Sequence, residues 1–235
     1  MYPHQSEHTT HYSILITISM AKVMIKSVYW KTLPQLIVFD LDMCFWSPEM
    51  YELDEIPTPS SIVTGDLGNG VEGCIAVKSG REEIRVFPDA LKVLQDFHNG
   101  HFGNDMRIAA ASSADTPRAV SIGRAALGLL EVVPGVTVRS VFARGWPEGF
   151  EGNLQIGRTP PLSSNKAATH FPLLKQHTGI AYDKMVFFDD CNWGDHCSAV
   201  EKGCSGVVTQ RTPQGLQLRE FTAALDRYEK KEASK

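Results

Sequence analysis

The stretch Leu36–Asp42 constrains the fold of this chain more than any other part of its sequence. Its four consecutive apolar residues, Leu36 to Phe39, predict a strand that is buried on both faces of a sheet. Asp40 and Asp42 follow where this strand should end, and residues two positions apart in extended backbone point to the same side. Both carboxylates are therefore expected in one crevice at the carboxyl end of a strand, where open α/β sheets bind their ligands.

Two carboxylates this close repel each other unless a cation lies between them or one of them keeps its proton. The first arrangement gives a site for a hard cation, and the second gives a nucleophile beside a general acid. Aspartate at a strand end also serves as a turn residue or a helix cap, so this stretch alone does not separate chemistry from structure.

Two later apolar stretches also end in polar side chains. Residues 106–111 predict a buried strand followed by Ser112–Ser113, and residues 185–188 predict another followed by Asp189–Asp190. Lys166 stands between them at the head of a predicted short helix. The carboxyl ends of parallel strands lie on one edge of a sheet, so these side chains are expected to meet there. Carboxylates suit Mg²⁺, and a lysine and a hydroxyl suit phosphate oxygens.

Strands and helices alternate along most of the chain, which predicts an α/β fold with a doubly wound parallel sheet. We expect a third strand of this sheet at Val136–Phe142 and a Gly- and Pro-rich loop at 144–164. Two short strands around Ser79–Gly80 predict a β-hairpin within a small insertion at about 49–86, which is too short for a large cap domain.

The expected division of the chain has three parts. Residues 1–34 form an extension that we expect to be partly disordered, 35–226 form the α/β domain, and 227–235 form a charged tail. The apolar stretch at 14–25 is short and contains Lys22, so it does not predict a membrane span, and no Lys or Arg precedes it, so it is a poor secretory signal. Organelle targeting by the extension stays open.

Composition excludes some partners and compartments. The chain has 235 residues and a net charge of −4, with no long basic run, which argues against nucleic acid as a partner. Its 5 cysteines include no CxxC pair, which argues against a disulfide framework and favours a reducing, cytoplasmic compartment. Cys191, His196 and Cys197 are close in sequence but lack the spacing of zinc ligands, so we expect no zinc site there.

Other polar and aromatic residues are less informative. His170 and His196 are expected to be structural. Trp46, Trp146 and Trp193 either border the crevice or pack in the core, and the sequence does not choose between these places.

The order of the motifs resembles that of the haloacid dehalogenase (HAD) superfamily: a DxD pair after the first strand, a serine after a later strand, a lysine, and then an apolar strand that ends in DD. More narrowly, it is similar to the eukaryotic magnesium-dependent phosphatase (acid phosphatase) branch. The residues that match this branch are Phe39–Asp42 with Trp46, Ala109–Ser112, Lys166 with Thr169–Phe171, and Met185–Asp190. The resemblance covers about residues 35–226.

The resemblance implies a HAD-like core, without a cap or with only a small hairpin, and a Mg²⁺-dependent phosphomonoesterase. It implies that Asp40 attacks phosphorus to form an aspartyl-phosphate, and that Asp42 protonates the leaving oxygen and then takes a proton from the hydrolytic water. Ser112–Ser113 and Lys166 are implied to hold the phosphoryl oxygens. The implied metal ligands are Asp40, the backbone carbonyl of Asp42, and the pair Asp189 and Asp190.

Two residues depart from the family pattern. Cys44 stands where the superfamily usually has threonine, and a thiol is a weak hydrogen-bond partner, which leaves the geometry of this loop open. Pro172 replaces the usual helix former and is tolerated only in the first turn of a helix. Neither change removes a reacting group.

Three functions stay open on the sequence. The first is a phosphomonoesterase acting on a phosphorylated small molecule or a phosphoprotein, of the phosphotyrosine or sugar phosphate type. A dehalogenase is disfavoured, because Asp42 supplies an acid that a halide does not need. The second is a phosphoacceptor signalling module, which the position of DD after Lys166 disfavours. The third is a catalytically inactive HAD-like scaffold, which Cys44 motivates.

Overall fold

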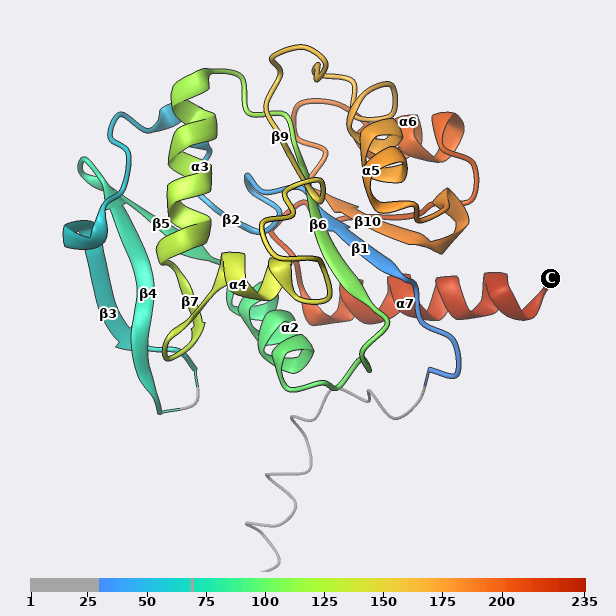
Figure 1. The fold of residues 1–235 in the computed structure, drawn as a ribbon, viewed down its shortest axis with the longest axis horizontal. Helices are drawn as coiled ribbons and strands as arrows, with labels where there is room; N and C mark the ends of the chain where they lie inside the picture. The colour runs from blue at the N-terminus through green and yellow to red at the C-terminus, as the bar shows by residue number, and fades with distance from the viewer. Residues whose placement is uncertain (1–29, 69) are drawn as a thin grey trace, which may run out of the picture.

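The structure is a computed structural model that describes residues 30–68 and 70–235. The expected extension over 1–34 lies outside the described residues up to position 29. In the described part, a five-stranded parallel sheet forms the centre of the molecule and helices cover both of its faces (Figure 1). This confirms the predicted α/β class with a doubly wound parallel sheet.

The central sheet has the strand order β11-β10-β1-β6-β9. Its strands are β1 (Leu36–Phe39), β6 (Arg107–Ser112), β9 (Leu154–Ile156), β10 (Met185–Asp189) and β11 (Val208–Arg211). β1 is the middle strand because its residues are buried on both sides, with Leu36 and Val38 in one core cluster and Ile37 and Phe39 in the other. Its neighbours β6 and β10 run parallel to it, so the residues after all three strands meet at one edge.

Helices pack on the sheet in two groups. The first group belongs to the larger core cluster and consists of α2 (Pro88–His98), α3 (Pro117–Leu129), α4 (Val138–Ala143) and α7 (Leu218–Ala233). The second group covers the other face and consists of α5 (His170–Thr178) and α6 (His196–Gly203). Pro172 lies in the first turn of α5, where proline is tolerated. α7 continues through 227–233, where a tail was expected, because Tyr228 is fully buried.

A second, antiparallel sheet lies beside α3 (Figure 1). Its strand order is β2-β5-β4-β3, formed by β2 (Trp46–Ser47), β3 (Ile62–Asp66), β4 (Glu72–Ser79) and β5 (Glu82–Val86). The expected hairpin is present as β4 and β5, and two further strands extend it. The remaining short elements are the 3-10 helices η1 (Met50–Glu52), η2 (Pro59–Ser61) and η3 (Tyr182–Lys184) and the strands β7 (Glu131–Val133) and β8 (Val136–Thr137).

One expected strand was wrong. Residues 136–142 do not join the central sheet but form β8 and most of α4. Val138, Val141 and Phe142 are the buried residues of α4, and this spacing of three and four is that of a helix face. The strand that completes the sheet is β9, inside the residues that were expected to form a loop. β9 has only 3 residues, too few for its periodicity to be recognised.

Candidate active site

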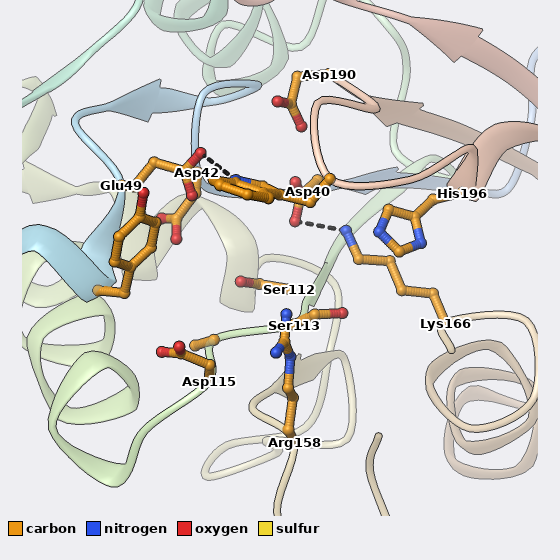
Figure 2. A pocket seen from close by; sticks show the side chains of 13 residues that line it. Asp40, Asp42, Glu49, Ser112, Ser113, Asp115, Arg158, Lys166, Asp190 and His196 are labelled. Atoms are coloured by element: carbon orange, nitrogen blue, oxygen red, sulfur yellow. Dashed lines mark hydrogen bonds and ion pairs between the residues drawn. The ribbon is translucent and has the colours of Figure 1, made fainter. Parts of the chain in front are cut away.

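A pocket of about 340 Å³ opens at the carboxyl ends of β1, β6 and β10 (Figure 2). Its lining includes six residues expected from the sequence: Asp40, Asp42, Ser112, Ser113, Lys166 and Asp190. Asp189, the seventh expected residue, is fully buried and contacts Lys166 instead of lining the pocket. The other lining residues are Glu49, Tyr51, Ala114, Asp115, Arg158, Trp193 and His196.

Asp40 occupies the first position after β1. Its N–H donates to the Phe188 carbonyl of β10 at 2.9 Å, so the sheet still holds its backbone. The next residue, Leu41, is fully buried in the core, whereas Asp40 and Asp42 line the pocket. The alternation of extended backbone therefore accounts for the two carboxyl groups sharing one pocket.

Two hydrogen bonds hold the Asp42 carboxyl group. Oδ1 accepts from Trp46 Nε1 at 2.9 Å, and Oδ2 accepts from the Met50 N–H at 3.1 Å. Met43 adopts a left-handed φ of 54° in the turn between Asp42 and Trp46. Met50 packs on Gly123 of α3, where a Cβ atom would lie 2.3 Å from the Met50 sulfur. The segment that positions Asp42 is thus packed closely against a helix.

Lys166 is the most constrained charged residue of the site. Its Nζ lies 2.7 Å from Asp40 Oδ1 and 2.6 Å from Asp189 Oδ2. The Lys166 side chain is only 2% exposed, so solvent screens these contacts little. A buried group of ions is stable only while each charge keeps its partners, because an unpaired buried charge is costly.

Burial also controls the protonation of the acids. Burial is the main cause that raises the pKa of Asp40, and Lys166 opposes it. Burial raises the pKa of Asp42 to about 7 and that of Asp190 to about 6. For Lys166, burial disfavours the charge, but the attraction of Asp189 and Asp40 outweighs burial and raises its pKa. The carboxyl groups therefore need a further positive charge nearby to stay ionised together.

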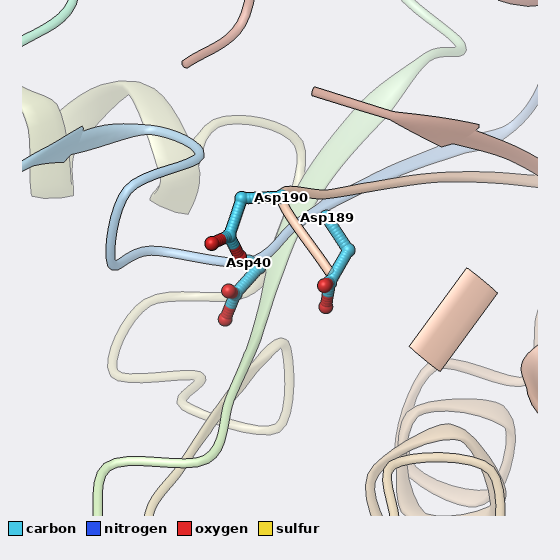
Figure 3. A group of neighbouring side chains, drawn as sticks. All are labelled: Asp40, Asp189 and Asp190. Atoms are coloured by element: carbon cyan, nitrogen blue, oxygen red, sulfur yellow. The ribbon is translucent and has the colours of Figure 1, made fainter. Parts of the chain in front are cut away.

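Asp40, Asp189 and Asp190 form a cluster in which one oxygen of each carboxylate lies within 4.8 Å of the others (Figure 3). Three carboxylates and the single ammonium group of Lys166 leave two uncompensated negative charges. A divalent cation carries that charge, and hard divalent cations prefer oxygen ligands. These residues therefore fit the divalent metal that the resemblance implies.

The two members of the DD pair have different partners. Asp189 uses both oxygens, because Oδ2 contacts Lys166 and Oδ1 accepts from the Cys191 N–H at 2.8 Å. Asp190 lines the pocket, and its Oδ2 accepts a longer bond of 3.3 Å from the Asn192 N–H. The Asp190 carboxylate is therefore more available to a cation than the Asp189 carboxylate.

The serines and His170 lie at the end of β6. Ser112 is buried, and its carbonyl accepts from the Gly157 N–H at 2.9 Å and from His170 Nε2 at 3.0 Å. Burial lowers the pKa of His170 to about 4, so this imidazole is neutral and supports the backbone. The buried Ser113 Oγ has no hydrogen-bond partner among the described residues.

Cys44, two residues after Asp42 in the sequence, is fully buried. Its carbonyl accepts from the Leu216 N–H at 2.8 Å. Burial raises the pKa of its thiol well above the usual value, and the neighbouring Thr212 hydroxyl opposes this only in part. Cys44 therefore fills its position as a neutral core side chain, and both acids still line the pocket.

The sequence did not predict most of the rim of the pocket, which includes Glu49, Tyr51, Asp115 and Arg158, and it left Trp193 between the crevice and the core. Trp193 is 72% exposed, its Nε1 donates to Glu49 Oε1 at 2.7 Å, and its ring meets Tyr51 edge-on at 6.1 Å. Arg158 follows β9 and was missed because β9 was not recognised as a strand. The run Leu154–Ile156 before a glycine was the only signal, and it was too short to use.

The structure gives the positions of the tryptophan side chains and of His196 relative to the pocket. Trp193 borders the pocket, Trp46 is fully buried, and Trp146 stacks on the Phe150 ring with centroids 4.9 Å apart. His196 lines the pocket, and burial lowers its pKa, so it carries no charge at neutral pH.

Comparison with known proteins gives two similarities. A family model described as acid phosphatase matches residues 32–231 of the chain. The crystal structure of CbbY from Rhodobacter sphaeroides in complex with phosphate is similar with 13% identity and a TM-score of 0.44, over 83% of this chain and 100% of that chain. No curated protein sequence matches the chain significantly.

The ion triad predicts a large loss of stability when its cation is removed. Lys166→Met should lower the free energy of unfolding by roughly 3–5 kcal/mol at pH 7, because Asp40 and Asp189 then stay buried without a partner. The loss should be smaller at pH 5, because burial raises the pKa of Asp40 and this carboxyl group is then neutralised more easily. Urea denaturation at both pH values measures the effect.

Lys184→Met is the matched control for this substitution. Lys184 pairs with Glu232 at 2.5 Å and is partly exposed, so its removal should cost roughly 1 kcal/mol or less. If both variants lose the same free energy of unfolding, the buried triad stabilises the fold no more than an exposed ion pair does.

His170 predicts a pH dependence of stability. Its pKa is about 4 in the fold against the ordinary 6.5, so the unfolded chain binds a proton first as the pH falls. Its contribution is complete above pH 6.5 and is lost between about pH 6.5 and 4. His170→Gln keeps a donor for the Ser112 carbonyl but does not titrate. The variant should lose less stability than the wild type over this window, by up to about 3 kcal/mol in urea denaturation; parallel curves would contradict the prediction.

Proposed function

The chain belongs to the acid phosphatase family, and we propose that it hydrolyses phosphomonoesters through an aspartyl-phosphate intermediate, with Mg²⁺ as its cofactor. Family membership supports phosphatase activity and a divalent metal. The roles of single residues are inferred from the geometry of the pocket.

One observation carries the proposal: the Asp40 carboxylate lies in a pocket together with a buried ammonium group and a cluster of oxygen ligands that suits a divalent ion. Phosphoryl transfer depends on positioning and on neutralising charge on the phosphoryl oxygens. A carboxylate nucleophile beside a fixed cation meets both needs, and a second acid, Asp42, lines the same pocket.

In the first step, an oxygen of Asp40 attacks phosphorus and the bond from phosphorus to the ester oxygen breaks. Asp42 donates its proton to the leaving oxygen, so the product is an alcohol and the protein carries an aspartyl-phosphate. Trp46 and Met50 orient the Asp42 carboxyl group for this transfer. Lys166 stabilises the ionised Asp40 before the attack.

In the second step, water attacks the same phosphorus and Asp42 takes its proton. The bond between phosphorus and Asp40 breaks, inorganic phosphate leaves, and the Asp40 carboxylate is restored. Ser112 is assigned to the phosphoryl oxygens because it lines the pocket at the end of β6, and Ser113 lines the pocket beside it. A bound divalent ion would supply charge neutralisation and alignment of the phosphoryl group.

We assign Asp40 and Asp190, with the Asp42 backbone carbonyl, as the metal ligands. Asp189 is assigned to holding Lys166, because both of its oxygens already have partners within the protein. This division gives the two members of the DD pair separate tasks.

The shape of the pocket bears on the substrate. None of the lining residues belongs to β3, β4 or β5, so within the described residues the second sheet does not close the pocket. An uncapped pocket admits a phosphoprotein side chain of the phosphotyrosine type as well as a sugar phosphate. The partners are therefore phosphorylated small molecules or phosphoproteins, and neither nucleic acid nor a membrane is proposed.

We also propose a cytoplasmic location. All 5 cysteines are free thiols, which suits a reducing compartment. None of the described helices is long and apolar enough to cross a membrane.

The role of Asp40 predicts loss of turnover in Asp40→Asn. The amide is a poor nucleophile, so kcat on a phosphomonoester with Mg²⁺ should fall by about three orders of magnitude or more. Asp54→Asn, a change at an exposed aspartate outside the pocket, is the control and should keep its activity. Circular dichroism checks that both variants fold. Activity of the Asp40 variant close to wild type would exclude it as the nucleophile, and a stable phosphorylated wild type without turnover would favour a signalling module.

The metal cluster predicts activity that depends on a divalent ion. EDTA should abolish turnover and added Mg²⁺ should restore it. Asp190→Asn should raise the Mg²⁺ concentration for half-maximal activity roughly tenfold or more, because it removes one charged oxygen ligand. Calorimetric titration with Mg²⁺ checks the binding directly. Full activity in EDTA, or unchanged Mg²⁺ affinity in the variant, would contradict the assignment.

A further inference from the structure

One positive side chain in the pocket takes no part in the proposed reaction. Arg158 lines the pocket but forms no ion pair or hydrogen bond with any described residue. Lys166, the other lysine or arginine of the lining, is held between two carboxylates. Arg158 is therefore the charged donor in this pocket that remains available to an anion.

The backbone holds Arg158 beside the end of β6. β9 pairs in parallel with β6, with Ile156 opposite Ser112. The Gly157 N–H donates to the Ser112 carbonyl at 2.9 Å, and Gly157 has a φ of 127°, a conformation that favours glycine. Arg158 comes directly after this anchored residue. Figure 2 shows its side chain pointing toward Ser112 and Ser113.

Ser113 supplies a second donor at the same place. Its Oγ is buried without a hydrogen-bond partner among the described residues, although Ser113 lines the pocket. A buried hydroxyl of this kind is costly unless a ligand or water completes it. A guanidinium group binds a carboxylate or a phosphate through two parallel hydrogen bonds, and a hydroxyl can add a third.

The charges around the pocket are unevenly distributed. Asp42, Glu49 and Asp115 also line it, and Figure 2 shows Asp42 and Glu49 away from Arg158 and Asp115 nearer to it. A negative substituent on a bound substrate is repelled by these acids and attracted to the guanidinium group. A neutral substituent has no such preference.

We propose that Arg158 and the Ser113 hydroxyl bind a second anionic group, a carboxylate or a further phosphate, on the substrate whose ester Asp40 cleaves. This inference rests on the proposed phosphatase function and narrows its substrate class to phosphomonoesters with a second anionic group. The hydrogen bond from the Gly157 N–H to the Ser112 carbonyl holds the backbone of Arg158 close to the proposed phosphoryl site. The second anionic group of the substrate should therefore lie a short distance from the ester.

Three phosphomonoesters of matched length test the preference. Phosphoglycolate carries a carboxylate, 2-hydroxyethyl phosphate a hydroxyl group and phosphoethanolamine an ammonium group. In the wild type with Mg²⁺, kcat/KM for phosphoglycolate should exceed that for 2-hydroxyethyl phosphate by roughly tenfold or more, the usual size of a charge-assisted contact. A ratio near one would overturn the proposal.

Substitutions of Arg158 test whether this residue is the cause. Arg158→Gln should bring the ratio close to one, and Arg158→Glu should reverse it in favour of phosphoethanolamine. Arg81→Gln, at the exposed turn between β4 and β5, is the control and should keep the wild-type ratio. If Arg158→Gln weakens all three substrates equally, the residue acts on the shared phosphoryl group and the proposal is wrong.

A binding measurement separates this inference from the phosphatase proposal. Calorimetry on Asp40→Asn and on Asp40→Asn with Arg158→Gln gives the affinity for each of the three compounds without turnover. If the wild type hydrolyses none of them, the phosphatase proposal fails, but a tenfold affinity preference that depends on Arg158 still supports the second subsite. If the wild type hydrolyses and binds all three esters equally well, the phosphatase proposal stands and the second subsite is wrong.

Discussion

The buried ion triad of Lys166 with Asp40 and Asp189 is the interaction on which the rest of the site depends. It joins the turn before α5 to the ends of β1 and β10, and all three partners are almost fully removed from solvent. Each carboxylate is tolerated there because the ammonium group is present. The same burial that makes the triad costly to break holds the proposed nucleophile in one orientation.

The single ammonium group of the triad does not neutralise all the carboxylates around it. Two negative charges remain uncompensated in the carboxylate cluster, and a bound divalent cation would balance them. With the cluster balanced in this way, a phosphate ester that enters the pocket meets one further cation, Arg158, and an acidic rim. The proposed roles are thus divided between two groups of residues: the proposed reacting groups follow the central strands, and the proposed selectivity residue follows the edge strand β9.

Membership of the acid phosphatase family agrees with the resemblance seen in the motifs, and the α/β fold was predicted correctly because its long buried strands have clear apolar patterns. The error at 136–142 arose because a short helix of valine and phenylalanine looks like a strand when only its composition is considered. β9 escaped notice because a strand of 3 residues has no periodicity, and its place in the sheet depends on pairing with β6.

Motif spacing and alternation are local properties of the chain, so the amino-acid sequence is sufficient to identify the chemical groups at the strand ends. It therefore predicted Asp40, Asp42, Ser112, Lys166 and the DD pair as one candidate set. The partners of these groups become known only from the folded arrangement: Asp189 contacts Lys166, Asp190 lines the pocket, and Arg158 has no counterion among the described residues. Such pairing depends on distances and burial between residues far apart in the chain, which no local pattern encodes.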